Sequence, residues 1–576
     1  MSDKKVNIET VRHSLSHVLA MAVLEMFPEA KLGIGPAIDN GFYYDFDLPR
    51  TLIPEDLPIL EEKMRKIIEK NIKIEKHEKT KKEAIEFIKK TNQPYKAELV
   101  EELEDEKAGF YTIDGFIDLC KGPHVASTGE LKDIGFKLHK IAGAYWRGSE
   151  KNKMLQRIYG LAFETPEDLK KYEEVLIEAE KRDHRKLGKE LDLFVFSDLV
   201  GPGLPLFTPK GTFIRETLQK KVEDICRKYG FQKVSTPHLA KIDLYKISGH
   251  ADKFGDELFH VTSAKDHDFV LKPVQCPHQT QIYASRQRSY KDLPISYMES
   301  EKQYRAEKSG EVGGLNRVYA ITCEDGHTFC TPSQVKDQIK NLVNIIKDFY
   351  SSLGMWDNHW VSLSVRDYSH PEKYIGDTKD WDLCEKTLQE ISDEMGLEAK
   401  RCEGEAALYG PKLDFMFKDA TGREIQIPTI QLDFATPKRF NLTYINEGGE
   451  AASPVMIHRA ILGSYERFMA LLIEHFAGAF PVWLAPVQAV IIPISEKQLE
   501  YAKKVEKELL EKNIRVEVDE RNESMGKKIR ESEMQKIPYM LIVGDKEKEA
   551  NKVAVRKYGE GDKGLMSTED IVKGII

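Results

Sequence analysis

Four residues in two short segments have the spacing of a reactive or metal-binding site. In HSLSH, His13 and His17 are four positions apart, and in DLCKGPH the same separation links Cys120 and His124. Residues four apart lie on one face of a helix, so each pair can direct its side chains at one point. Imidazole and thiolate bind zinc, and neutral imidazole can also activate water near pH 7. These four residues, called the quartet below, therefore hold either a metal ion or a substrate.

The composition is that of a multidomain protein of a reducing compartment. Its 576 residues, 41% of them hydrophobic, exceed what one hydrophobic core organises and predict about three or four domains. The seven cysteines form no CxxC pair, which argues against a disulfide framework. No segment has the apolar character of a signal peptide or a membrane span, so we expect a cytoplasmic protein with no membrane partner. The net charge of −9 neither supports nor excludes an RNA partner.

The elements that must position the quartet belong to an N-terminal domain. Residues 1–164 combine a helix over 10–27, alternating stretches such as GFYYDFD, and a charged block over 57–90 that we expect to be helical. This mixture indicates an α+β domain. At residue 165, Thr-Pro-Glu-Asp has the pattern of a capped helix start, and we expect a linker helix over 165–190.

Two further domains are expected after the linker. In residues 191–485, strand-like runs and helices follow no strict alternation, which favours an α+β fold with a largely antiparallel sheet. Residues 486–576 have the strand–helix rhythm of a small α/β domain with a parallel or mixed sheet.

Two motifs in the larger domain carry arginines suited to binding phosphate. In YRAEKSGEVGGLNRV, we expect Arg305 and Glu307 on one face of a strand, before a glycine-rich turn that leads to Arg317. In MIHRAILGSYERFMALL, a helix start made of small residues precedes Arg467, and a helix N-terminus favours a triphosphate. R-x-E alone is also the pattern of a solvent-facing ion pair. The second motif favours nucleotide binding.

These motifs resemble those of a known family. R-x-E followed by G-x-x-x-R resembles the second and third signature motifs of class II aminoacyl-tRNA synthetases. FYYDFD, DLCKGPHV, GAYWRGSEKNKMLQRIYG, YGPKLDF, QLDF and MIHRAILGS resemble threonyl-tRNA synthetases, in that family's order and over nearly the whole chain. We expect a form that lacks the family's N-terminal ubiquitin-like domain. The resemblance implies an α+β multidomain fold: an N-terminal editing domain, a class II catalytic core on an antiparallel sheet, and an α/β anticodon-binding domain.

The resemblance implies a two-step ligase. Threonine and ATP give threonyl-adenylate, and the 3′ end of threonine tRNA then accepts the acyl group. The first step is an in-line attack on the α-phosphate of ATP, which an enzyme accelerates mainly by positioning the reactants and stabilising charge. The implied catalytic residues are Arg305 and Arg467, and Glu307, Arg317 and Gln426 complete the implied ATP site. We expect Mg²⁺ with the nucleotide.

The resemblance also implies one zinc ion per subunit, in the catalytic domain. The matching ligands are Cys276, His327 and His458, which are called the trio below. Three protein ligands leave a position for the amino group and hydroxyl of threonine, and valine has no hydroxyl to offer. The other implied pocket residues are Asp325, Tyr409, Lys412 and Gln431. The separations between the three ligands do not by themselves predict zinc.

The quartet has a different implied role, which is proofreading. Serine lacks one methyl group of threonine, which is worth roughly 1–3 kcal/mol of discrimination, so a second, hydrolytic sieve is expected. The resemblance places His13, His17, Cys120 and His124 in the editing pocket that cleaves seryl-tRNA. Lys96 is implied nearby, and Asp118 is a candidate for binding the misattached amino group.

The remaining implied contacts are with tRNA and with a second subunit. Glu547 and Arg556 match positions that read anticodon bases. The stretch TFIRETLQKKVEDICRKYGFQKVSTP resembles the family's dimer-forming first motif, so we expect a homodimer.

The chain departs from the family pattern in two places. Ile321 replaces an aromatic residue that stacks on adenine in the family, and Cys323 replaces a glutamine. In addition, QCPHQ replaces the commoner N-C-P-G-H. The second change puts His278 beside Cys276, where it either competes for metal or faces solvent. Two alternatives stay open: a catalytically altered synthetase-like protein that binds RNA for regulation, and a trans-editing hydrolase.

Overall fold

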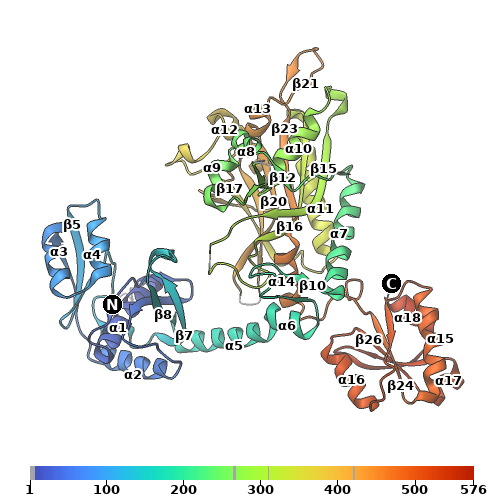
Figure 1. Cartoon of the computed structure of the whole chain (residues 1–576), viewed down its shortest axis with the longest axis horizontal. Helices are drawn as coiled ribbons and strands as arrows, with labels where there is room; N and C mark the ends of the chain where they lie inside the picture. Colours follow the sequence, from blue (N-terminus) through green and yellow to red (C-terminus); the bar gives the residue numbers. More distant parts are fainter. Residues whose placement is uncertain (1–6, 264–267, 309, 420–421, 576) are drawn as a thin grey trace. The chain divides into compact units, whose positions relative to one another are not determined.

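The chain divides into two compact units between residues 177 and 178 (Figure 1). The computed structural model describes residues 7–263, 268–308, 310–419 and 422–575. The division falls inside helix α5 (Pro166–Arg182), which is exposed over most of its length and whose start is capped by Thr165. The predicted linker helix is interrupted at Asp183, which caps a second helix, α6 (His184–Glu190). Among the residues described, no helix combines the length and apolar character needed to cross a membrane.

The first unit contains two antiparallel sheets. Its elements are α1 (Ile8–Met26), β1 (Lys31–Leu32), β2 (Ala37–Ile38), β3 (Gly41–Asp47), α2 (Asp56–Glu69), β4 (Ile74–Thr80), α3 (Lys81–Lys90), α4 (Pro94–Glu101), β5 (Lys107–Ile113), β6 (Phe116–Leu119), β7 (Gly135–Tyr145) and β8 (Met154–Phe163). The larger sheet has the order β1-β3-β8-β7, with β2 paired to β3, and the smaller has the order β4-β5-β6. Helices α1 and α2 pack against the larger sheet, and α3 packs against the smaller one.

Helix α1 is the structural centre of this unit. The side chain of Asn7 caps its first turn by accepting a hydrogen bond from the backbone N–H of Glu9 at 2.9 Å. The residues from Ser14 to Val23 are buried on every side, as expected for a helix that runs through a core rather than along a surface. His17 is therefore carried into the interior, while His13 remains partly accessible one turn earlier.

The helical prediction for residues 57–90 is wrong in its middle. Asn71, whose φ of 49° is left-handed, follows α2, and β4 then pairs antiparallel with β5. Ile74 is the one buried residue of β4. The alternation that reveals a half-buried strand is therefore missing from the sequence, and the backbone pairing with β5 holds the strand instead.

The second unit is built on an eight-stranded sheet. Its elements before residue 486 are β9 (Phe194–Val195), β10 (Leu206–Phe207), α7 (Pro209–Lys228), β11 (Gln232–Lys233), β12 (Leu239–Ala240), α8 (Ile242–Ser248), α9 (His250–Phe254), β13 (His260–Thr262), β14 (Asp268–Leu271), α10 (Cys276–Ala284), β15 (Ile295–Tyr304), β16 (Ala320–Cys330), α11 (Val335–Ser351), β17 (His359–Val365), α12 (Thr378–Glu394), β18 (Lys400–Glu403), β19 (Lys412–Lys418), β20 (Glu424–Asp433), α13 (Ala435–Arg439), β21 (Tyr444–Ile445), β22 (Ala451–Ala452), β23 (Val455–Ser464) and α14 (Tyr465–His475). The strand order is β11-β15-β16-β23-β20-β19-β17-β18. Only the outermost pairs, β11–β15 and β17–β18, are parallel. The predicted largely antiparallel sheet is confirmed.

The two faces of this sheet differ in character. Ile430, Leu432 and Ile457 project from one face into the largest hydrophobic core, which α7, α11, α12 and α14 complete. The alternate residues, Gln431 and His458, project from the opposite face, because successive side chains of a strand point to opposite sides. The polar face is the one that carries the predicted site.

The last part of the chain forms the predicted small α/β fold. Its elements are β24 (Ala489–Pro493), α15 (Leu499–Leu510), β25 (Val516–Val518), α16 (Met525–Met534), β26 (Tyr539–Val543), α17 (Asp545–Ala550), β27 (Val553–Lys557), β28 (Gly561–Met566) and α18 (Thr568–Ile575). β24 pairs in parallel with β25 and β26, whereas β27 and β28 extend the sheet antiparallel, so the sheet is mixed.

A buried ion pair joins two adjacent inner strands of the large sheet. Glu324 of β16 and Arg459 of β23 are almost fully buried and form a salt bridge beneath the polar face. The second carboxylate oxygen of Glu324 accepts from the N–H of Ile461 at 2.8 Å. The pairing of β16 with β23 contains a register shift between Glu324 and Gly326. The ion pair therefore lies at the one place where this ladder is irregular.

We expect Arg459→Met to destabilise the second unit by about 3–5 kcal/mol, because it leaves the Glu324 carboxylate buried without its partner. The double variant with Glu324→Gln removes the charge and keeps an acceptor for Ile461, and it should recover most of the loss. Differential scanning calorimetry measures both. Equal destabilisation by the single and the double variant would contradict this explanation.

Candidate functional site

The polar face of the large sheet brings distant residues into one row across the strands. His327 of β16 is opposite His458 of β23, His458 is opposite Gln431 of β20, and Gln431 is opposite Lys412 of β19. Directly opposed residues in antiparallel strands project from the same face with their Cβ atoms about 5 Å apart. Four predicted site residues are therefore neighbours, although they are far apart in the sequence.

Cys276 joins this row from outside the sheet. It is the first residue of α10, and its sulfur and one ring nitrogen each of His327 and His458 all lie within 4.8 Å of one another. All three residues are buried. The structure thus brings together the complete predicted trio, with the donor types and the closeness that a zinc site requires.

Hydrogen bonds leave one nitrogen of each histidine of the trio free for a ligand role. His458 donates from Nε2 to Asp433 at 2.8 Å, and His327 donates from Nδ1 to the side-chain oxygen of Gln279 at 2.8 Å. Nε2 of His327 is buried without a hydrogen-bond partner. A histidine that donates from one nitrogen presents a lone pair on the other, and metal-binding histidines are oriented in this way. The trio therefore fits a zinc ion.

The electrostatic surroundings of the trio also suit a cation. Burial, together with the carboxylates of Asp325 and Asp433, raises the pKa of the Cys276 thiol well above its usual value. Burial raises the pKa of Asp325 to about 7, and one of its oxygens lies 3.8 Å from Nε2 of His327. A metal ion bound here would displace the thiol proton and lower both pKa values.

The other predicted pocket residues surround the trio. The hydroxyl of Tyr409 donates to Gln431 at 2.6 Å, and its ring stacks on His458 with a centroid separation of 4.4 Å. Lys412 forms an ion pair with Asp414 at 3.0 Å. Together with Asp325, these side chains form a polar wall beside the trio.

The predicted phosphate-binding residues Arg305 and Glu307 follow a strand instead of lying on it. β15 ends at Tyr304, and the backbone N–H of Ala306 bonds to the carbonyl of Glu257, outside the sheet. The prediction that both lie on one strand face is wrong: the N–H of Arg305 still bonds to the carbonyl of Tyr319, and the chain leaves the ladder at Ala306. Glu307 instead accepts from Nε of Arg317 at 2.7 Å, across the loop.

The second predicted phosphate-binding motif forms the expected helix start before Arg467. Ser464 ends β23 and caps α14 by accepting from the N–H of Arg467 at 3.3 Å, and the Arg467 side chain is exposed in the first turn. The preceding residue, Glu466, is fully buried and accepts from the N–H of Thr322 at 2.8 Å, which ties this helix start to β16. Gln426 lies on β20 and donates to Asp414 at 2.7 Å.

The residues that depart from the family pattern line the open face of β16. Ile321, Cys323 and Asp325 alternate with the buried Thr322 and Glu324, and each is partly exposed. Cys323 is opposite Ser464, so this wall runs from the start of α14 to the trio. Both substitutions therefore lie on the site itself.

The prediction for His278 is wrong in both of its forms. The residue is 8% exposed, so it does not face solvent, and it is absent from the groups of possible metal ligands found among the described residues. Its ring lies near Tyr245, at a centroid separation of 6.1 Å, and burial lowers its pKa to about 4.

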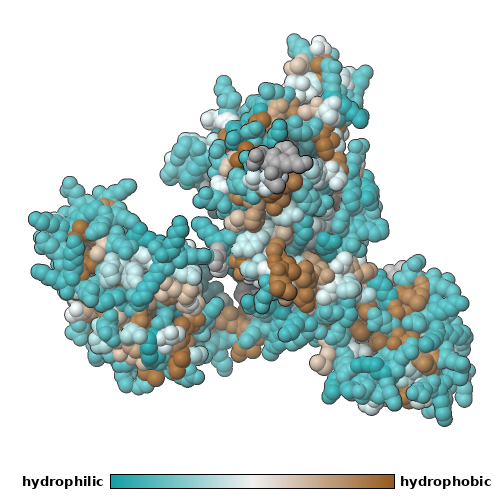
Figure 2. Space-filling view, in the orientation of Figure 1, coloured by the Kyte–Doolittle hydropathy of each residue, from teal (hydrophilic) through white to brown (hydrophobic). Residues whose placement is uncertain are grey.

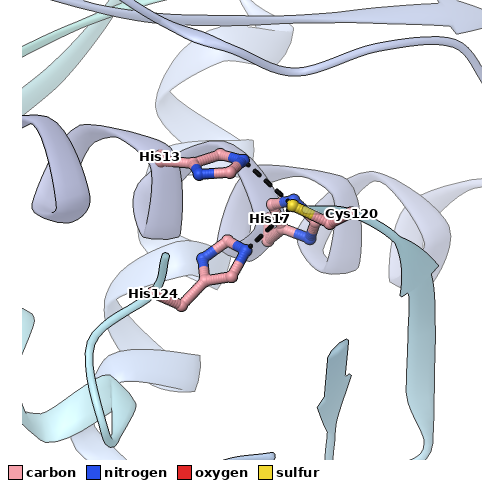
Figure 3. Close-up of side chains that lie close together, drawn as sticks. All are labelled: His13, His17, Cys120 and His124. Carbon is pink, nitrogen blue, oxygen red and sulfur yellow. Dashed lines mark hydrogen bonds between the residues drawn. The ribbon is translucent and has the colours of Figure 1, made fainter. Parts of the chain in front are cut away.

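The quartet converges in the first unit (Figure 3). α1 supplies His13 and His17, the end of β6 leads to Cys120, and the following loop supplies His124. The sulfur of Cys120 lies 3.2 Å from Nε2 of His13 and 3.3 Å from Nε2 of His124. All four ligand atoms lie within 4.8 Å of one another, so closeness alone does not distinguish the quartet from the trio.

The hydrogen bonds of the quartet fix two of its tautomers. His13 must donate from Nδ1 to the carbonyl of Pro123 at 3.2 Å, because a carbonyl only accepts. The Ser14 hydroxyl donates to the carbonyl of Thr10, so Nδ1 of His124, at 3.1 Å, donates to Ser14. Both rings therefore present the lone pair of Nε2 towards Cys120.

An almost fully buried ammonium–carboxylate pair adjoins the quartet. Lys96 forms an ion pair with Asp118 at 2.6 Å, and both side chains are almost fully buried. The hydroxyl of Tyr44 donates to the other oxygen of Asp118 at 2.5 Å, and Nδ1 of His17 lies 3.5 Å from that oxygen. Tyr44 lies in FYYDFD but was not predicted as a site residue, because tyrosine in an alternating strand is an ordinary core residue.

Burial keeps the quartet uncharged. It lowers the pKa of His13, of His17 and of His124, in the last case to about 2, and it raises the pKa of the Cys120 thiol to about 11. The nearby Lys96 ammonium lowers the pKa of His13 and His17 further. Near neutral pH the site therefore contains neutral imidazoles, which are proton acceptors, and a protonated thiol rather than a charged nucleophile.

The predicted anticodon residues lie at the far end of the chain. Glu547 is in α17 and accepts from the N–H of Gly544 at 2.9 Å, while Arg556 is on β27, 3.6 Å from the carboxylate of Glu533. Both side chains are partly exposed.

Three protein-family models match the chain. Residues 259–476 match the class II tRNA synthetase core domain (G, H, P, S and T), residues 488–576 match an anticodon binding domain, and residues 109–159 match the second additional domain of threonyl and alanyl tRNA synthetases. The last match includes Asp118, Cys120 and His124.

Curated relatives and solved structures are similar over most of the chain. The threonine–tRNA ligase of Halalkalibacterium halodurans is 48% identical over 572 residues, which is 99% of this chain and 88% of the relative. That of Gloeobacter violaceus is 47% identical, over 98% of this chain and 91% of the relative. The crystal structure of the RNA binding domain of threonyl-tRNA synthetase from Cryptosporidium parvum has a TM-score of 0.64 and 35% identity, and it covers 68% of this chain and 97% of that one.

We expect the first unit to lose stability as the pH falls below the ordinary histidine pKa of 6.5, because His17 is held neutral in the folded state and takes up a proton on unfolding. His17 alone should contribute about 1.4 kcal/mol per pH unit below that value. Hydrogen exchange of α1, corrected for the intrinsic rate, measures the effect. In His17→Asn the dependence should be shallower, and an unchanged dependence would contradict this assignment.

Proposed function

The chain belongs to the threonine–tRNA ligase family, and we propose that it activates threonine with ATP, transfers it to the 3′ end of threonine tRNA, and hydrolyses seryl-tRNA. The identity of 48% over 99% of the chain carries the ligase activity. The match of residues 109–159 to a domain of threonyl and alanyl tRNA synthetases supports the editing step. We place the editing domain at 1–164, the linker at 165–190, the catalytic domain at 191–485 and the anticodon-binding domain at 486–576.

The adenylation step requires positioned positive charge at the triphosphate. In our proposal Arg305 binds the α-phosphate and Arg467 the γ-phosphate, while Glu307, Arg317 and Gln426 hold the nucleotide. The position of Arg467 in the first turn of α14 supports its role, because the helix dipole adds to its charge there. Mg²⁺ would accompany the ATP and neutralise the leaving pyrophosphate.

The trio would hold one zinc ion per subunit, which when bound supplies a Lewis-acidic position for the amino group and hydroxyl of threonine. The free nitrogens of His327 and His458, and the carboxylates near Cys276, support this assignment. Asp325 would accept from the hydroxyl of threonine, and Tyr409, Lys412 and Gln431 would line the pocket. Valine offers no hydroxyl, so it would leave these polar groups unpaired.

We assign the quartet to metal-free hydrolysis of seryl-tRNA. The buried Lys96 ammonium opposes a second cation at this place. Nε2 of His13 and of His124 can each accept a proton from a water molecule as that water attacks the ester. Asp118 already binds Lys96 and Tyr44, which supports a role in orienting Lys96 and leaves the recognition of the misattached amine as a prediction.

The partners of the proposed enzyme are threonine, ATP and threonine tRNA. Glu547 and Arg556 would read anticodon bases in the last domain. We propose a cytoplasmic location, where these substrates are present. Ile321 and Cys323 alter the adenine wall but replace no ligand and neither of the two catalytic arginines, so they favour a divergent enzyme over an RNA-binding regulator.

Aminoacylation of threonine tRNA with threonine and with serine tests the function and both sites. Cys276→Ser should lose bound zinc and charge threonine at least about a hundredfold more slowly, because one of three ligands is missing. His13→Ala should keep its zinc, charge threonine at the normal rate and accumulate seryl-tRNA. Metal content, measured by atomic emission, and acid-stable aminoacyl-tRNA are the two readouts.

If the assignment of zinc to the trio is wrong, the two variants should show the opposite metal contents. Loss of zinc in His13→Ala, with Cys276→Ser retaining its metal, would identify the quartet as the metal site. Absence of threonine-dependent ATP–pyrophosphate exchange in the zinc-loaded parent protein would refute the ligase activity itself.

An exposed apolar segment supports the proposed homodimer. Between β9 and β10, Leu199 is fully exposed, and large parts of Phe196 and Val200 are accessible. Figure 2 shows a brown, apolar patch on the second unit at the place where Figure 1 labels α14, beside the label of β10. A contiguous exposed apolar patch of this kind is typical of a protein–protein interface. The neighbouring α7 lies in the stretch that resembles the dimer-forming motif.

We expect a solution mass of twice the 66.0 kDa of the chain. Leu199→Glu combined with Phe196→Glu should shift the protein towards the monomer, because it places charge in a desolvated contact. Multi-angle light scattering measures the mass. Ile59→Glu is the matched control, since Ile59 is 48% exposed on α2 in the first unit. A monomeric parent protein would exclude the dimer.

A further inference from the structure

His184 is a buried histidine to which the proposed function assigns no role. It is the first residue of α6 and is 3% exposed. Asp183 caps the helix by accepting from the N–H of Arg185 at 2.7 Å. A buried imidazole at a helix start needs partners for both ring nitrogens, and the identity of those partners indicates what the ring holds together.

The two nitrogens of His184 have different partners and different protonation. Nε2 lies 3.1 Å from the backbone N–H of Leu315, and Nδ1 lies 2.7 Å from a carboxylate oxygen of Glu474. A backbone N–H only donates, so Nε2 carries no proton and Nδ1 donates to Glu474. Asp183, His184 and Glu474 also lie close enough to form a metal site, but His184 has no lone pair left for an ion.

These bonds join two segments that carry the predicted ATP residues. Leu315 belongs to the loop that contains Glu307 and Arg317. Glu474 is in the last turn of α14, whose first turn carries Arg467. His184 is thus a direct link between the loop and the helix.

The loop passes over the ring without spare room. Gly314 has a φ of 52°, and a Cβ added to it would lie 2.2 Å from Nε2 of His184. The next residue, Leu315, is completely buried in the main core, which also contains Leu187 of α6. On either side of Leu315, by contrast, Arg317 and Glu311 are exposed and pair with each other at 2.8 Å. The loop is therefore fixed in the core at Leu315, while the charged side chains next to it are accessible.

We propose that His184 is a positioning residue for ATP, which fixes the loop at Leu315 so that Arg305, Glu307 and Arg317 meet the nucleotide already in place. The inference rests on the proposed ATP site. His184 does not touch the nucleotide: it acts through Leu315. A loop that is ordered before binding spares the ligand the free-energy cost of ordering it. The threonine pocket is built on β16, β20 and β23, to which His184 is not bonded, so its affinity should not depend on this residue.

The first test is the Michaelis constant of each substrate in ATP–pyrophosphate exchange. His184→Ala should raise the KM for ATP about tenfold, since one hydrogen bond to the loop backbone is lost, and should leave the KM for threonine within about twofold. A purely structural role would lower stability or affect both constants alike. The control is His370→Ala. His370 also bonds a carboxylate, that of Asp367 at 2.8 Å, but it is exposed and is not hydrogen-bonded to the loop that contains Leu315.

Two conservative variants test separately the hydrogen bonds of His184 to Leu315 and to Glu474. The side chain of Gln in His184→Gln can place an acceptor where Nε2 lies and preserve the bond to Leu315, whereas Asn in His184→Asn can place a donor where Nδ1 lies and preserve the bond to Glu474. If the loop contact positions ATP, His184→Gln should restore the KM for ATP more fully than His184→Asn. The reverse order would overturn the proposal.

A direct measurement of ATP binding distinguishes a failure of this inference from a failure of the proposed function. Calorimetric titration of the full chain with Mg²⁺–ATP does not require any reaction. Weaker ATP binding in His184→Ala, in a protein that shows no threonine-dependent exchange, would refute the ligase and support the positioning role. Equal ATP affinity and equal KM in the parent and in His184→Ala would refute the positioning role, whatever the ligase activity.

Discussion

The register between β16 and β23 is the constraint on which the catalytic face depends. A slip of one residue would turn His458 into the core and Arg459 onto the polar face, because side chains alternate along a strand. The salt bridge between Glu324 and Arg459 prevents that slip, since neither charge can be buried without the other. The same contact lies at the bulge after Glu324, so the irregular point of the ladder is also its most strongly specified point. The placement of His327 opposite His458 follows from it.

The arrangement of side chains on the polar face follows from this register. β20 and β19 continue the row with Gln431 and Lys412, and β16 extends it towards the start of α14 through Asp325 and Cys323. One strand, β16, therefore contributes to both the amino acid pocket and the nucleotide wall. The buried Glu466 ties that strand to the helix of Arg467 through Thr322. A rigid sheet thus carries the groups that must stay at fixed separations.

The sequence predicted local features well and long-range pairings poorly. The quartet was visible because His13 and His17, like Cys120 and His124, are four residues apart, and a helix start with small residues identified the surroundings of Arg467. The trio had no such signal, because β-sheet neighbours are chosen by strand order, which local periodicity does not encode. β4 was missed because its side chains are mostly exposed and its stability comes from pairing with β5. After Arg305 the chain leaves β15, and the N–H of Ala306 bonds to the carbonyl of Glu257, a long-range contact that the sequence does not reveal.

The two clusters of histidine and cysteine show that ligand type and closeness do not decide what a site binds. Both have ligand atoms within 4.8 Å of one another. Around the trio, Asp433 and Gln279 accept hydrogen bonds from the outer nitrogens, two carboxylates act on the thiol, and the buried Arg459 is paired with Glu324. Around the quartet, Lys96 already compensates Asp118, and a second positive charge would be repelled in a buried setting where water screens little. Similar side chains therefore favour a cation in one unit and a neutral proton acceptor in the other, because of the groups one contact further out.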